Sequence, residues 1–136
     1  MILTENKIDK KLLKRLKKIV RLYSVKDVEL VIVGQKEMKR LNREFRGKNS
    51  STDVLSFPLI ETPHSPLGSI VICKKFVKNG VKRFGHSKND EFTLLFIHGF
   101  LHLLGYDHEK DEKMRQEEEK IIKKFNLPVS LIIRND

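Results

Sequence analysis

The amino-acid sequence predicts an α/β or α+β fold, with a small mixed sheet of about four strands packed with about five helices. Segments with the apolar period of an amphipathic helix alternate along the chain with short apolar segments typical of strands. The connection over 34–54 is long enough to hold a crossover helix, so part of the sheet should be parallel. An apolar tail, 129–133, could pair as an edge strand or pack on the body of the protein.

The first half of the chain supplies two helices and two strands. Residues 8–23 place apolar side chains on one face and lysines over the rest, as in an amphipathic surface helix. Residues 28–33 predict a strand that stops at Gly34. Residues 36–45 have helical spacing, and 54–57 predict a second strand that a proline ends.

The second half supplies one strand and three helices. Residues 67–73 predict the third strand. A helix is favoured over 74–84, although a glycine within it weakens it by about 1 kcal/mol relative to alanine. Ser87 is a good N-cap for a helix that runs to about residue 104, and a last helix is predicted over 111–125.

Composition favours a folded, cytoplasmic protein. The chain has 136 residues, of which 39% are hydrophobic, and this is enough for one core. The single cysteine, Cys73, excludes an intrachain disulfide and a cysteine-based metal cluster. No apolar run approaches a membrane span, and the first residues lack the layout of a signal peptide. We therefore expect one domain over 1–136 that does not contact a membrane.

The positive charge lies mostly in the N-terminal half. The formal net charge is +10, and residues 1–60 carry +8 of it. This excess favours an acidic partner, with RNA or DNA as the first candidate and a membrane surface as the second. Many basic proteins bind nothing acidic, so the charge does not identify the partner. If the partner is RNA, the basic N-terminal helix and the loop at Arg46 should lie beside the catalytic site.

Three of the five histidines form a candidate metal site at the end of the central helix. His98 and His102 are four residues apart on the predicted helix, so their side chains share a face. Gly105 can end that helix and turn His108 back to the same point. Three neutral imidazoles leave one position for water, as in catalytic zinc sites. We predict one Zn²⁺ ion, although imidazoles also accept Ni²⁺ or Co²⁺. The alternative is an amphipathic helix with incidental core histidines.

The same histidine spacing occurs in the metzincin peptidases, whose pattern is H-E-x-x-H-x-x-G-x-x-H. Their glutamate is the general base of peptide hydrolysis. Gly99 stands at that position here, which argues against a peptidase.

A second resemblance comes from residues 98–108, H-G-F-L-H-L-L-G-Y-D-H. They closely resemble H-G-x-L-H-L-x-G-Y-D-H, the signature of the YbeY family of bacterial rRNA-maturation endoribonucleases. Residues 41–46 (L-N-R-E-F-R), 52–58 (T-D-V-L-S-F-P) and 85–87 (G-H-S) also agree, so the resemblance covers nearly the whole chain. One departure is Ser69, where the family usually has aspartate, and this leaves the role of the position open.

The resemblance implies a metal-dependent, single-strand-specific endoribonuclease that acts in 16S rRNA 3′-end maturation and ribosome quality control. It implies Zn²⁺ held by His98, His102 and His108, and a metal-bound water or hydroxide that hydrolyses a phosphodiester or assists its cleavage. Arg46 matches the family's functional arginine and would stabilise the phosphate, so Arg46 and His98 are the predicted catalytic residues. The implied partners are rRNA and the ribosome or its small subunit.

Two alternatives to an endoribonuclease remain at this point. One is a metal-dependent hydrolase of another substrate, such as a peptide. The other is a non-catalytic module that binds RNA or the ribosome and whose zinc is structural.

Overall fold

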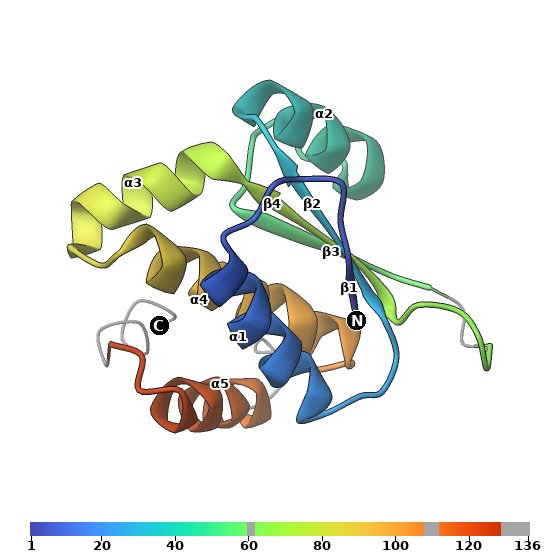
Figure 1. Cartoon of the computed structure of the whole chain (residues 1–136). Coiled ribbons are helices and arrows are strands. Elements are labelled where there is room, and N and C mark those ends of the chain that lie inside the picture. The colour runs from blue at the N-terminus through green and yellow to red at the C-terminus, as the bar shows by residue number, and fades with distance from the viewer. Residues whose placement is uncertain (60–61, 108–111, 129–136) are drawn as a thin grey trace.

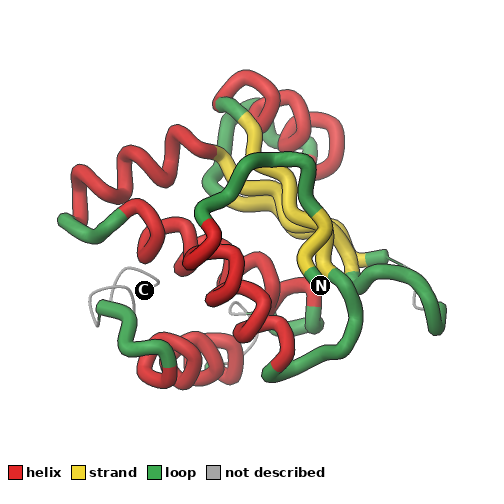
Figure 2. The backbone as a smooth tube through the Cα atoms, in the orientation of Figure 1, coloured by secondary structure: helices red, strands yellow, loops and turns green. Residues whose placement is uncertain are grey.

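A computed structural model describes residues 1–59, 62–107 and 112–128 (Figure 1). Four strands form one sheet in the order β1–β2–β4–β3, and helices cover both of its faces (Figure 2). The strands are β1 (Ile2–Leu3), β2 (Val28–Val33), β3 (Val54–Pro58) and β4 (Gly68–Cys73). The helices are α1 (Lys10–Arg21), α2 (Gln35–Arg46), α3 (Lys74–Phe84), α4 (Lys88–Leu103) and α5 (Lys113–Lys124).

The predicted mixed sheet with interleaved helices is confirmed, with two differences in detail. β1, β2 and β4 run parallel, and β3 pairs antiparallel with β4. The connection over 34–54 does hold a helix, but it leads into β3, which runs opposite to β2. No sequence pattern predicted β1, because a strand of two residues is too short to show a period. The tail 129–133 lies outside the described residues.

Alternate residues of the central strands face two different cores, because successive side chains of a strand point to opposite sides of the sheet. Ile70 and Ile72 point into the larger core, which α1, α4 and α5 share. Val71 points into a smaller core that includes Met38 of α2. The sheet therefore separates α2 from α1 and α4, and α5 packs on α4 away from the sheet (Figure 1).

α4 is the central helix of the fold. Eleven of its sixteen residues are buried, because it contacts the sheet, α1, α3 and α5. Its predicted N-cap, Ser87, accepts a hydrogen bond of 3.1 Å from the backbone N–H of Asp90. A helix that is enclosed in this way holds its side chains in fixed directions, which suits a site that needs precise geometry.

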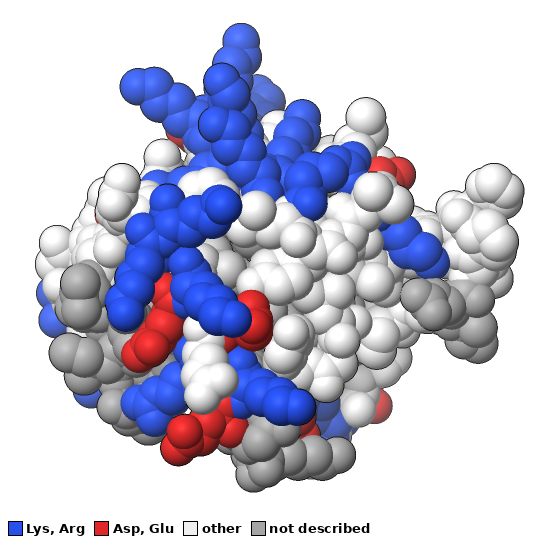
Figure 3. All heavy atoms as spheres, turned by 90° about the horizontal axis from the view of Figure 1, so that it is seen from below, with Lys and Arg blue, Asp and Glu red and all other residues white. Residues whose placement is uncertain are grey.

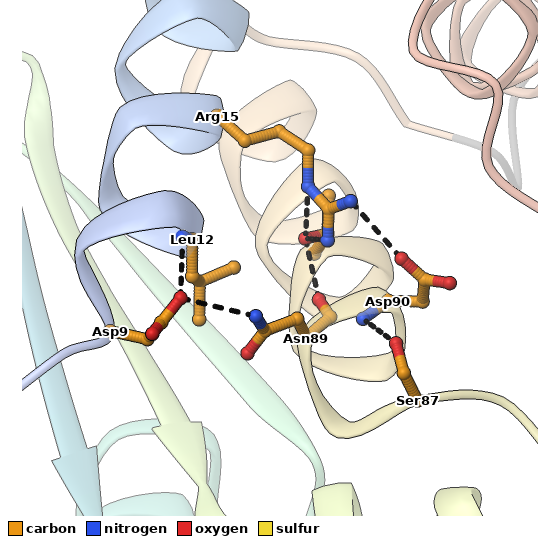
Figure 4. A network of polar contacts seen from close by, with 7 residues as sticks. Asp9, Leu12, Arg15, Ser87, Asn89 and Asp90 are labelled. Carbon is orange, nitrogen blue, oxygen red and sulfur yellow. Dashed lines mark hydrogen bonds and ion pairs between the residues drawn. The ribbon is translucent and has the colours of Figure 1, made fainter.

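Arg15 joins α1 to α4 through a polar network (Figure 4). Its guanidinium donates to the Thr93 hydroxyl at 2.7 and 3.1 Å, and to the Asp90 carboxylate at 3.1 Å. The Asn89 side chain donates to the carboxylate of Asp9, which is the N-cap of α1. The start of α4 is thus held against α1 by directional contacts as well as by apolar packing.

Tyr23, just after α1, joins this helix to α5. Its hydroxyl donates a 2.5 Å hydrogen bond to the Glu117 carboxylate, and its ring meets Phe100 of α4 edge to face. Burial of the hydroxyl and its bond to Glu117 raise the pKa of Tyr23, and the same bond lowers the pKa of Glu117. The three helices on this side of the sheet are therefore tied to one another.

Candidate metal centre

His98 and His102 come together on α4. Their Nε2 atoms are 3.3 Å apart, and the two rings meet edge to face with centroids 4.8 Å apart. The His98 side chain is 24% exposed, so the pair lies at the border between the core and solvent. The structure thus brings together two of the three predicted metal ligands, at a place that a substrate can reach.

Each ring is oriented by a contact of its other nitrogen. His98 Nδ1 lies 3.2 Å from the Glu118 carboxylate, and His102 Nδ1 lies 3.1 Å from the backbone oxygen of Tyr106. A carboxylate and a carbonyl only accept hydrogen bonds, so each Nδ1 must carry the proton. In the neutral rings, both Nε2 atoms then keep a lone pair directed to the same space. Metal-binding histidines are typically fixed in this manner.

The spacing of the two Nε2 atoms fits a single tetrahedral ion. With Zn–N distances of about 2.0–2.1 Å, two ligands of one tetrahedral zinc ion lie about 3.3 Å apart. The observed separation is 3.3 Å. Two lone pairs that face each other at this distance repel unless a cation or a proton lies between them. The donor set therefore suits a divalent ion.

The third predicted ligand, His108, lies outside the described residues. Among the residues that are described, no group of three His, Cys, Asp or Glu side chains is arranged to hold a metal ion. The assignment of His108 as a ligand stays a prediction.

Glu118 is the site residue that the sequence analysis missed. Its carboxylate contacts a histidine twenty positions away, and the residue is only 3% exposed. One signal was present in the sequence: Glu118 lies between Met114 and Ile121 on the buried face of α5, where the helical period predicts an apolar residue. A carboxylate buried at such a position is usually paired.

Gly99 allows α4 to lie close against the sheet beside the histidines. A Cβ atom at this position would come within 2.9 Å of methyl groups of both Val54 and Ile70. It would also be 3.1 Å from the Ser56 hydroxyl, which donates a 2.7 Å hydrogen bond to the Gly99 carbonyl. The position that carries the metzincin glutamate is therefore filled by the sheet in this fold.

Arg46 is the last residue of α2, which packs on the other face of the sheet from α4. Its side chain is exposed, and within the described part of the chain no hydrogen bond or ion pair joins it to His98 or His102. The adjacent Phe45 meets Phe57 edge to face, which places the end of α2 over the edge strand β3. A role for Arg46 in catalysis stays a prediction.

Ser69 lies on the side of the sheet opposite to the histidines. Its neighbour Ile70 faces α4, so the Ser69 side chain points the other way. Its hydroxyl donates a 2.7 Å hydrogen bond to the Glu29 carboxylate on the paired strand β2. In this chain Ser69 therefore makes a cross-strand contact and does not support the histidine pair.

Comparison with known proteins identifies the family. A family model described as Endoribonuclease YbeY matches residues 3–126. The chain belongs to this family. Endoribonuclease YbeY of Nautilia profundicola is 56% identical over 123 residues, which cover 90% of this chain and 88% of that protein. Endoribonuclease YbeY of Sulfurimonas denitrificans is 59% identical over 112 residues, which cover 82% and 81%.

The YbeY fold is also found in a solved structure. The solution structure of TM1509 from Thermotoga maritima is 34% identical and superposes with a TM-score of 0.62, over 90% of this chain and 87% of that one. The predicted family, the α/β fold class and the endoribonuclease activity are thus confirmed. Membership in the YbeY family implies a metal-dependent nuclease that acts in rRNA processing. None of the helices in the described part of the chain has the length and apolarity that a bilayer span requires.

Proposed function

We propose that this chain cleaves single-stranded RNA in the maturation of the 16S rRNA 3′ end, with the ribosome or its small subunit as its partner. The observation that carries the proposal is the pair of Nε2 atoms of His98 and His102, which are spaced for one tetrahedral ion. The proposed ion is Zn²⁺, held by these two residues and His108. When bound, such an ion supplies positive charge beside the phosphodiester and makes a coordinated water more acidic.

The protein's contribution is to fix the orientation of the two histidine rings. The Glu118 carboxylate accepts a hydrogen bond from the Nδ1–H group of His98. This bond fixes the ring and makes its Nε2 atom a stronger electron donor to a metal. The Tyr106 carbonyl does the same for His102. Because Glu118 is nearly fully buried, its carboxylate has little freedom to move away.

Arg46 is proposed to bind a phosphate oxygen of the RNA. A guanidinium presents two parallel N–H groups to a phosphate, and charge-assisted bonds of this kind are among the stronger ones. Its position at the end of α2 requires the RNA to pass around the edge strand β3 in order to contact Arg46 and the histidines together. His98 takes part in catalysis through its contact with the ion.

Cleavage of a labelled single-stranded RNA by the zinc-loaded chain tests the proposal. We expect His102→Ala to lose both the metal and the cleavage, and Arg46→Ala to lose cleavage while it keeps the metal. His64→Ala, which changes an exposed loop histidine, is the matched control and should cleave like the wild type. Equal cleavage by all four proteins would indicate a contaminating nuclease and contradict the proposal, as would cleavage of a duplex at the same rate.

The role of Glu118 has its own test. Glu118→Gln keeps the size of the side chain but removes its charge, so zinc affinity should fall by about 10–100-fold. Glu119→Gln, on the adjacent, partly exposed residue of the same helix, controls for the loss of one negative charge. Competition with a chelator measures both affinities, and equal affinities would show that Glu118 does not position His98.

A further inference from the structure

A basic groove lies between α1 and the C-terminal end of α5. It is a hollow of about 650 Å³, and α1 contributes four of the cations that line it. α5 contributes a fifth cation at its last residue, and none of the described residues that line the hollow is a carboxylate. The five cations are Lys14, Lys17, Lys18, Arg21 and Lys124. We propose that this groove is a second RNA-binding site, which holds the phosphate backbone of the substrate away from the histidines; the proposal rests on the proposed function.

The charges in the groove are not neutralised within the described chain. All five side chains are exposed, and in this part of the protein none of the four lysines has a carboxylate partner. The Arg21 guanidinium contacts the backbone oxygen of Ser24 at 3.4 Å. Like charges held this close repel one another, so a bound anion would stabilise the surface.

A second basic hollow, on α2, differs from the groove in how far its positive charge is balanced by carboxylates. Its lining includes Glu37, and Arg40 forms ion pairs with both Glu37 and Glu44. Much of the positive charge there is already balanced. Among the described residues, the groove at α1 therefore differs from the hollow on α2 in that no carboxylate lines it.

The shape of the cation array favours a phosphate polymer over a single anion. Lys14, Lys17 and Arg21 follow one another at steps of three and four residues, so they form a line along one side of α1. At 1.5 Å per residue the line is about 10 Å long. Phe125 and Leu22 add apolar surface to the groove, and an aromatic ring there can stack with a base. Figure 3 looks at the underside of Figure 1, where α5 lies. Lys and Arg side chains gather toward the top of this view, and Asp and Glu side chains lie among them near its centre and lower edge.

The groove lies on the same side of the sheet as the histidines. α5 connects the two places directly, since Glu118 contacts His98 and Lys124 follows six residues later, about 9 Å along the helix axis. α1 is fixed to the histidine helix by the Arg15–Asp90 ion pair. An RNA strand long enough to pass from the groove to the histidines would contact both, and the groove would add affinity without taking part in the chemistry.

The test is RNA binding by a variant that removes three groove charges: Lys14→Gln, Lys17→Gln and Lys124→Gln. Fluorescence anisotropy with labelled poly(U) RNA measures the affinity of the full, zinc-loaded chain, and a gel checks that the RNA stays intact. We expect affinity to fall about tenfold, and the slope of log affinity against log salt to become less negative by about 2. Cleavage of an RNA too short to span from the histidines to the groove should not change.

A matched control removes the same charge elsewhere. Lys75→Gln, Lys78→Gln and Lys82→Gln change three exposed lysines of α3, which lie outside the groove. An equal loss of RNA affinity in this control would overturn the proposal, because net charge alone would explain it. Undiminished RNA binding by the groove variant would overturn it too. A groove variant that loses binding to phosphatidylserine vesicles and keeps binding to RNA would also overturn the proposal.

The two proposals fail in different ways. Cleavage that persists in His102→Ala would refute the proposed function of the metal site, whatever the groove variant does. Loss of cleavage in His102→Ala, together with wild-type poly(U) affinity in the groove variant, would refute only the second RNA-binding site.

Discussion

α1 and α2 are both basic helices of twelve residues, but they use their charges differently. α1 has seven Lys or Arg residues and no acid, whereas α2 has five and two glutamates. On α1 the ion pair in the described structure is that of Arg15, with Asp90 on another helix. On α2 the ion pairs of Arg40 are with glutamates of the same helix. A pair between helices fixes their packing, while a pair within one helix mainly balances charge.

The two helices differ less in the number of their positive charges than in where those charges lie. The N-terminal half was expected to form one basic surface beside the catalytic site. α1 does pack against α4, which carries His98 and His102. α2, which ends at Arg46, covers the opposite face of the sheet. The excess charge is therefore divided between two faces, and the helix on the histidine side keeps its lysines free of carboxylate partners in the described residues.

The largest expected difference between the two helices is in the stability that each loses when an inward-facing leucine is replaced by alanine. Leu16 of α1 is fully buried in the larger core, and Leu16→Ala should lower the free energy of unfolding by about 3 kcal/mol. Leu41 of α2 is partly buried against the smaller core, and Leu41→Ala should cost about 1 kcal/mol. Urea unfolding measures both values. Equal losses would show that both helices depend on burial to the same degree.

A smaller difference is expected for the arginines. Arg15→Met leaves the Asp90 carboxylate and the Thr93 hydroxyl without their donors, and should cost about 2 kcal/mol of unfolding free energy. Arg40→Met removes two exposed ion pairs of α2 and should leave the urea midpoint unchanged. If Arg40→Met proved as costly as Arg15→Met, pairs within a helix would stabilise this protein as well as pairs between helices.

The smallest effect concerns the contact between Tyr23 and Glu117, which has no counterpart on α2. Tyr23→Phe should cost about 1 kcal/mol at neutral pH. The bond lowers the pKa of Glu117 in the folded state, so its contribution is present above the pKa of an unfolded glutamate, about 4.3, and is lost as the pH falls through the lowered value. Unfolding curves of the wild type and the variant should therefore converge in acid.

Tyr106→Phe is the matched control for this contact. Tyr106 affects the pKa of Tyr23 only through the charge of an ionised tyrosine, so the effect of this variant should be small and constant from neutral to acidic pH. A constant gap between wild type and Tyr23→Phe down to low pH would contradict the assigned role of the Glu117 carboxylate.

The parts of the site that the sequence predicted are local, and those it missed are not. His98 and His102 are one helical turn apart, so a helical period alone places them together. Glu118 reaches His98 from a different helix, and this contact depends on how α4 and α5 pack. The direction of β3 likewise depends on pairing with β4, which the length of the connection over 34–54 could not determine.

The sheet residues under Gly99 limit which reactions this histidine pair could acquire through evolution. Replacing Gly99 with glutamate would drive the new side chain against methyl groups of Val54 and Ile70 before its carboxylate could reach a substrate. Those two residues belong to the main core, so making room for the base would first create cavities that destabilise the protein. A change from nuclease to peptidase chemistry therefore has no single-step path at this position.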